Sequence, residues 1–197
     1  MKRLITFDSI FVLQSLPEGD KMTGSNLYND LLSRRVRQMP GFHTEIHDIS
    51  DKEVFDNLMN QIKIACSNND IRPYLHFEMH GCKEGIQLSN RELLTWEKLY
   101  NYFVKINEIL RNQLFVSFAT CYGAYIFQVI DPLKRSPMFG FIGPSDQISA
   151  DNIEIDFYGY FDVLLSTKDF DLAIEALNNT NHTNKYVFNT SELIFNE

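Results

Sequence analysis

The stretch that decides the fold reads Leu114-Phe115-Val116-Ser117-Phe118-Ala119, and it runs directly into Thr120-Cys121-Tyr122-Gly123. Its first six residues are almost all apolar, as is typical of a parallel strand buried on both faces. Outward from it, strand and helix patterns alternate along the whole chain, which predicts a mostly parallel sheet covered by helices. We therefore expect an α/β fold, a three-layer sandwich with a sheet of about six strands and helices on both faces.

The predicted elements follow from apolar periodicity and from turn and capping residues. The expected strands are 10–16, 42–49, 72–80, 114–119, 138–143 and 186–188, with a short returning ribbon at 85–88. The expected helices are 25–38, 51–66, 94–110, 124–130, 151–165 and 170–178. No linker, repeat or low-complexity tract interrupts the series, so residues 1–197 are expected to form a single domain.

Composition narrows the function classes. The formal net charge is -8, which argues against nucleic acid as a partner. No apolar stretch is long enough to span a bilayer, so no membrane partner is expected. Three cysteines cannot all pair with one another, and none has CxxC spacing, so neither a disulfide framework nor a zinc ribbon is expected. These features favour a cytoplasmic protein.

Two predicted strands end in reactive residues, His80-Gly81 and Cys121-Tyr122-Gly123. Ligands of open α/β sheets bind beyond the carboxyl ends of the parallel strands. Only one long helix separates the two strands in the sequence, so we expect them to be neighbours. The pattern predicts a catalytic Cys121 and His80 pair at this edge.

A cysteine attacks as its thiolate, so Cys121 needs a neighbouring group that lowers its pKa. His80 and the start of the helix expected at 124–130 are both candidates, and His80 would later protonate the leaving amine. The N–H groups of Gly81 and Cys121 are candidates for an oxyanion hole.

The residues from Tyr74 to Gly81, and then Leu114 to Gly123, resemble the paired signature of the caspase-like superfamily of cysteine peptidases, clan CD. His80 precedes Cys121 by 41 residues, near the roughly 50 residues typical of caspases. Phe139 to Pro144, Asp146 and the aromatic-rich helix that follows look most like CHAT-type peptidases. The resemblance implies a caspase-like sandwich and a cysteine endopeptidase that works through a thioacyl-enzyme intermediate. It also implies that no metal or other cofactor is needed.

The specificity residues depart from the caspase pattern. The caspase Q-A-C-x-G motif is replaced by Ala119-Thr120-Cys121-Tyr122-Gly123, so the glutamine that lines the caspase specificity pocket is missing. The residue preferred before the cleaved bond therefore stays open. Ala119, Tyr122 and Asp146 are the expected substrate-binding residues. Acidic residues such as Asp146 and Asp151 make a basic preference conceivable, although Asp151 is expected to serve as a helix N-cap.

Three alternatives stay open beside this one. His76, Glu78, His80 and Cys82 share one parity and could bind zinc, although the glycine turn at Gly81 argues against it. Thr120 to Gly123 also loosely resembles the nucleophile elbow of glutamine amidotransferases, whose histidine would have to be the downstream His182. Finally, a non-catalytic binding module could retain the same fold.

The partners expected of a peptidase are a protein or peptide substrate and a regulator. We expect control by a separate protein partner or by cleavage within 131–136. A stand-alone CHAT-like peptidase would fit a role in prokaryotic defence, which follows from the resemblance alone.

Overall fold

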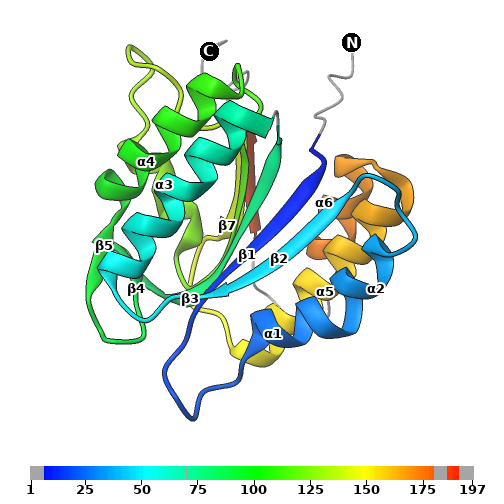
Figure 1. Ribbon diagram of the computed structural model, residues 1–197. Coiled ribbons are helices and arrows are strands. Elements are labelled where there is room, and N and C mark those ends of the chain that lie inside the picture. The colour runs from blue at the N-terminus through cyan, green and yellow to red at the C-terminus, as the bar shows by residue number, and fades with distance from the viewer. Residues whose placement is uncertain (1–6, 70, 180–185, 191–197) are drawn as a thin grey trace.

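The computed structural model describes residues 7–69, 71–179 and 186–190. In these ranges one mostly parallel sheet has the main strand order β2-β1-β3-β6-β7-β8 (Figure 1). All neighbours on this path are parallel except β7 and β8. The strands of this path are β1 (Ser9–Ser15), β2 (His43–Asp48), β3 (Pro73–Cys82), β6 (Phe115–Ala119), β7 (Gly140–Pro144) and β8 (Tyr186–Thr190). The prediction of about six strands in a mostly parallel sheet is confirmed.

Helices cover both faces of the sheet, so the three-layer α/β sandwich is also confirmed (Figure 1). One face carries α3 (Lys52–Asn69) and α4 (Trp96–Ile109). The opposite face carries α1 (Thr23–Leu27), η1 (Tyr28–Leu32), α2 (Ser33–Val36), α5 (Ala150–Thr167) and α6 (Phe170–Asn178).

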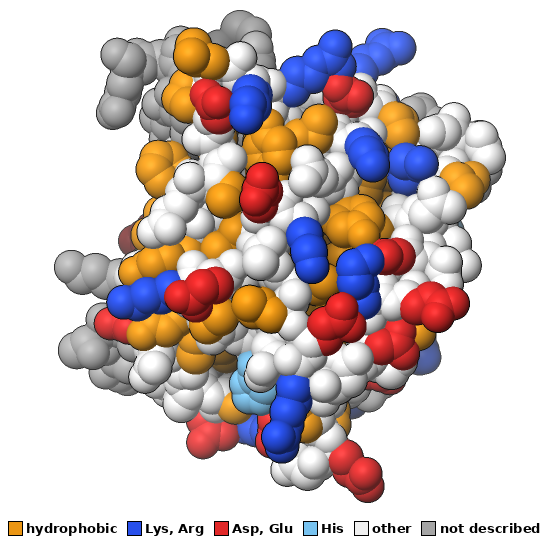
Figure 2. Space-filling view, turned by 90° about the vertical axis from the view of Figure 1, so that its left-hand side faces the viewer, with side chains coloured by type: hydrophobic (Ala, Val, Ile, Leu, Met, Phe, Trp, Pro, Cys, Tyr) orange, Lys and Arg blue, Asp and Glu red, His pale blue; other side chains and the backbone are white. Residues whose placement is uncertain are grey.

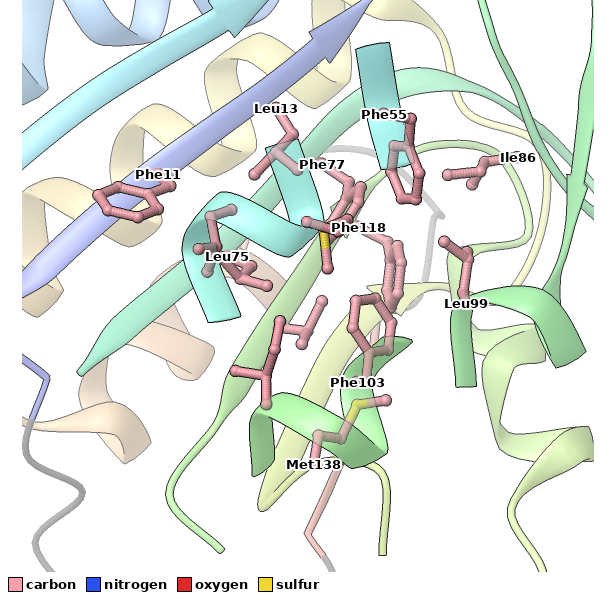
Figure 3. Close-up of a cluster of buried hydrophobic side chains, with 14 of the residues drawn as sticks. Phe11, Leu13, Phe55, Leu75, Phe77, Ile86, Leu99, Phe103, Phe118 and Met138 are labelled. Carbon is pink, nitrogen blue, oxygen red and sulfur yellow. The ribbon is translucent and has the colours of Figure 1, made fainter. Parts of the chain in front are cut away.

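The central strands are buried because alternate side chains enter two separate cores. On β3, Leu75 and Phe77 point toward α3 and α4, where they join Phe55, Phe103 and Phe118 (Figure 3). Tyr74 points the other way, into a cluster with Phe157 and Phe161 of α5. His76 and Glu78 lie two and four residues after Tyr74 on β3, so their side chains also face α5, as does that of Ser117, which pairs with His76 on β6.

Three stretches differ locally from the sequence prediction. Leu93–Thr95 is the short strand β5, not the start of the following helix, because it pairs with β4 (Gly85–Gln87). The helix expected at 25–38 is divided by the π-helix η1. The helix expected after Cys121 is a 3₁₀-helix, η2 (Gly123–Val129).

A fourth difference concerns the start of α5. Asp151 was expected to cap it, but Ser149 is the N-cap and its side chain accepts a hydrogen bond from the Asn152 N–H at 3.3 Å. Asp151 instead accepts one from Lys21 Nζ at 2.7 Å. The capping prediction for Asp151 was wrong because the helix begins at Ala150, where Ser149 supplies the capping oxygen, so Asp151 already lies inside the first turn.

In the described part of the chain, the surface over α3 and α4 carries charges of both signs and no large patch of like charge (Figure 2). Figure 2 shows Lys and Arg side chains interspersed with Asp and Glu on this face. Over the described ranges, none of the helices combines the length and apolar character needed to cross a membrane.

Candidate active site

The register of the two central strands brings the predicted pair to one place. Glu78 of β3 lies opposite Ala119 of β6 in a parallel pairing. His80 and Cys121 each follow this pair by two residues, which places them on the same face, toward α5. The expectation that these strands are neighbours is confirmed.

Gly81 allows the two strand ends to approach closely. A methyl group at Gly81 would lie 2.2 Å from Thr120 Oγ1 and 2.3 Å from the Cys121 carbonyl oxygen. Both distances are far below van der Waals contact, so only glycine fits unless the backbone moves. Gly81 thus permits the segment after His80 to pack against the segment that carries Cys121.

A cavity of about 240 Å³ opens where these segments meet. Its volume is below the roughly 300 Å³ at which sites for drug-sized ligands begin, so it suits a single side chain. The loop after β1, the ends of β3 and β6, and the segment leading into α5 form its walls. The residues that line it are Leu16, Asp20, Lys21, Thr23, Glu78, Met79, His80, Ala119, Thr120, Cys121, Ile148, Ala150 and Ile153.

Asp20 is a site residue that the sequence reasoning missed. His80 Nε2 lies 2.6 Å from Asp20 Oδ2, within hydrogen-bond distance. Asp20 follows β1, which pairs with β3, so its loop emerges at the same edge of the sheet. The sequence did contain a signal for Asp20, because it is an acidic residue in the loop that follows a strand expected to lie in the same parallel sheet.

Cys121 is partly buried, and the main chain before α5 holds its sulfur. The Ile148 N–H donates to Cys121 Sγ at 3.4 Å, and the thiol lies 3.6 Å from the Ile148 carbonyl oxygen. A donated N–H stabilises a thiolate more than a neutral thiol, because the hydrogen bond is stronger to a charged acceptor.

The other two cysteines occupy different environments. Burial raises the pKa of the Cys66 thiol to about 12, which keeps it protonated at neutral pH. Cys82 lies at the end of β3 and, among the described residues, is not one of those that line the cavity. Cys121 is therefore the cysteine that the cavity presents to a ligand.

The chain turns sharply after Cys121. Tyr122 has φ +58°, in the left-handed region that non-glycine residues rarely adopt. Its N–H donates to the Asp146 carbonyl oxygen at 3.1 Å, which fixes this turn to the segment before α5. Backbone strain of this kind clusters at functional sites, and here it follows the proposed nucleophile directly.

The three predicted substrate-binding residues separate into two groups. Ala119 is buried and lines the cavity. Tyr122 and Asp146 lie beside it, and among the described residues they do not line it. Burial, and then the Asp146 carboxylate, raise the pKa of the Tyr122 phenol, whose ring lies 5.6 Å from Lys83 Nζ.

A chain of buried polar groups continues from the cavity into the sheet. Thr23 Oγ1 donates to Glu78 Oε2 at 2.6 Å, and His76 Nε2 lies 2.9 Å from Glu78 Oε1. The other imidazole nitrogen of His76 lies 2.7 Å from Ser117 Oγ. His76, Glu78 and Ser117 are each almost completely buried.

These contacts bear on the alternative readings. His76 and Glu78 are engaged with each other, whereas His80 turns to Asp20. In the part of the chain that the structure describes, no group of three or more His, Cys, Asp or Glu side chains is arranged to hold a metal ion. His182, the histidine of the amidotransferase-like alternative, lies outside the described residues.

The roles of Gly81 and Cys121 as oxyanion donors stay predictions. Gly81 pairs with Ile86 in the β3 and β4 ribbon.

Comparison with known proteins assigns this chain to no family. No protein-family model matches the chain, and no curated protein matches it significantly.

Proposed function

We propose that this chain is a cysteine endopeptidase in which Cys121 is the nucleophile, His80 the general acid and base, and Asp20 the residue that orients His80. The single observation that carries the proposal is that all three residues line one cavity at the carboxyl ends of adjacent parallel strands. The order of His80 before Cys121, with an interval of 41 residues, is similar to the caspase-like pattern on which the sequence resemblance rests.

The protonation pattern follows from the hydrogen bonds. Asp20 accepts a hydrogen bond from His80 Nε2, which leaves Nδ1 as the nitrogen that can take a proton from the thiol. The carboxylate also stabilises the imidazolium that then forms. The Ile148 N–H, already directed at Cys121 Sγ, stabilises the thiolate.

The reaction then has two halves. The thiolate attacks the peptide carbonyl carbon, and the C–N bond breaks as His80 Nδ1–H protonates the leaving amine. The acyl group remains on sulfur as a thioester. His80 next takes a proton from water as the resulting hydroxide attacks the thioester carbon. The C–S bond breaks, the carboxylic acid is released, and His80 returns the proton to the Cys121 thiolate.

Covalent labelling tests this proposal. A peptidyl electrophile should modify Cys121 in the wild-type protein, and the modification should be located by mass spectrometry of the digested protein. Cys121→Ala should abolish both labelling and peptide hydrolysis while melting close to the wild type, because within the described ranges the hydrogen bonds of Sγ are confined to the main chain of Ile148.

Cys82→Ala is the matched control, since Cys82 is also partly exposed but does not line the described cavity. It should keep full activity. His80→Ala should lower turnover by the 10²–10⁴-fold typical of general acid and base catalysis. An inert Cys121 in a well-folded protein would instead support a non-catalytic binding module.

A further inference from the structure

The cavity beside Cys121 has a buried carboxylate in its wall. Glu78 is 1% exposed, yet it borders the cavity two residues before His80 on the same face of β3. Two residues of strand span about 6 to 7 Å, so Glu78 lies one long side chain away from the reacting groups.

Glu78 retains capacity for another hydrogen-bond donor. One carboxylate oxygen accepts from Thr23 and the other is paired with His76. A carboxylate offers about four acceptor sites, so two contacts leave room for a ligand's donors.

The contacts of Glu78 are compatible with a neutral imidazole. An imidazole with its proton on Nε2 satisfies both contacts of His76: it donates to Glu78, and its Nδ1 accepts from the Ser117 hydroxyl. A cationic ligand group would add a charge-assisted hydrogen bond to the Glu78 carboxylate, which is stronger than a hydrogen bond between neutral groups.

The only lysine that lines the cavity in the described chain is already paired. Lys21 Nζ contacts Asp151 at 2.7 Å and also contacts Glu154. Hydrogen bonds to these two carboxylates raise the pKa of Lys21. Its charge is therefore matched by two acids outside the cavity lining and is not available to Glu78.

Thr120 lines the cavity, but its hydroxyl turns away from Glu78. Thr120 Oγ1 lies where a Gly81 side chain would be, on the face of β3 opposite Glu78, and among the described residues it makes no hydrogen bond. The Glu78 carboxylate is therefore the buried acceptor that this wall offers to a ligand group with several N–H donors.

We propose that Glu78 makes this cavity select a lysine or arginine side chain at the residue on the amino side of the cleaved bond. This inference rests on the proposed peptidase function. The long aliphatic stem would pack against Leu16, Ile148 and Ile153, and the charged end would meet Glu78. An aspartate or glutamate side chain would meet the Glu78 charge and be rejected.

The test compares peptide substrates that differ only at this residue: lysine, norleucine and glutamate. Norleucine keeps the lysine stem without the ammonium group. The lysine peptide should have a kcat/KM about ten to a hundred times that of the norleucine peptide, as expected for one hydrogen-bonded charge pair, and the glutamate peptide should be poorest.

Glu78→Gln should lower the lysine-to-norleucine ratio about tenfold. The ratio is measured within one variant, so it does not depend on the fraction folded. Asp48→Asn is the matched control, because Asp48 is an exposed acid at the same edge of the sheet but outside this cavity. It should keep the wild-type ratio.

The outcomes separate the two proposals. Norleucine or glutamate peptides cleaved as well as the lysine peptide by the wild type, or an unchanged ratio in a folded Glu78→Gln variant, would overturn the role of Glu78 and leave the peptidase intact. If Glu78→Gln does not fold, the wild-type ratio alone decides. No cleavage of any peptide and no labelling of Cys121 would overturn the peptidase function, and this inference with it.

Discussion

Replacing Asp20 with asparagine tests the hydrogen bond that orients His80. The change keeps the shape of the side chain but removes its charge, and an amide can present its NH₂ group to Nε2 and so favour the wrong tautomer. His80 would then carry its proton on Nδ1, where a base is needed. The expected result is a lower kcat/KM with little change in folding.

The size of the expected loss in kcat/KM follows from how far solvent reaches the hydrogen bond between His80 and Asp20. A hydrogen bond to a charged group contributes about 1.5–3 kcal/mol. The side chains of His80 and Asp20 are 53% and 42% exposed, so solvent screens the contact. We therefore take a value of about 1 kcal/mol or slightly more. That corresponds to a loss of about five- to tenfold in kcat/KM.

The assay is steady-state hydrolysis of a lysine-containing peptide, accompanied by a thermal melt of each variant. Glu18→Gln is the control, because Glu18 is an exposed acid on the same loop that does not line the cavity. Unchanged activity in Asp20→Asn beside an inactive His80→Ala would refute the orienting role. An equal loss in Glu18→Gln would assign the effect to the general charge of the loop.

Three further predictions concern stability. Gly81→Ala should lower the free energy of unfolding by about 1–3 kcal/mol, because the added methyl would meet Thr120 and Cys121. Gly159→Ala should instead stabilise α5 by about 0.5–1 kcal/mol, since nothing lies within 4 Å of the added carbon; calorimetry of both variants checks this. Ser117→Ala should cost about 1–3 kcal/mol by leaving His76 Nδ1 buried without its partner, measured by denaturant unfolding, and a neutral result would contradict the continuous polar chain. Stability should fall as pH rises above about 9, because burial raises the pKa of Cys66 from 9.0 to about 12 and also raises the pKa values of Tyr74 and Tyr186. The folded state therefore binds these protons more tightly than the unfolded state does. The resulting stabilisation is fully present below the unfolded-state pKa values and is lost as pH rises toward the folded-state values. Melts in a pH series check the third prediction, and a flat profile between about pH 9 and 11 would contradict it.

The sequence by itself determined the layers of the fold. The apolar run of β6 predicts a central strand, and all of its residues are buried. The helix expected at 170–178 has those bounds in the structure. Alternation of strand and helix patterns is a local property that the chain displays residue by residue, so it can be read without knowing any long-range contact.

The sequence also determined that His80 and Cys121 lie near the carboxyl ends of neighbouring strands, because strands separated by a single helix usually pair. The strand expected to stop at His80 runs on through Gly81 to Cys82, because this stretch pairs with β4. It did not determine what surrounds them. Asp20 reaches His80 across 60 residues of chain, and Ile148 reaches Cys121 across 27. Both contacts depend on loop conformations that leave no periodic signal.

Only the tertiary structure decided which hydrogen-bond partners the polar residues of β3 have. Strand parity predicts that His76, Glu78 and His80 share a face, which made them resemble a set of metal ligands. The neighbouring elements then give each of them a different partner: α1 brings Thr23 onto Glu78, β6 brings Ser117 to His76, and the loop after β1 brings Asp20 to His80. Parity fixes the direction of a side chain, but only the packed neighbours decide which group it binds.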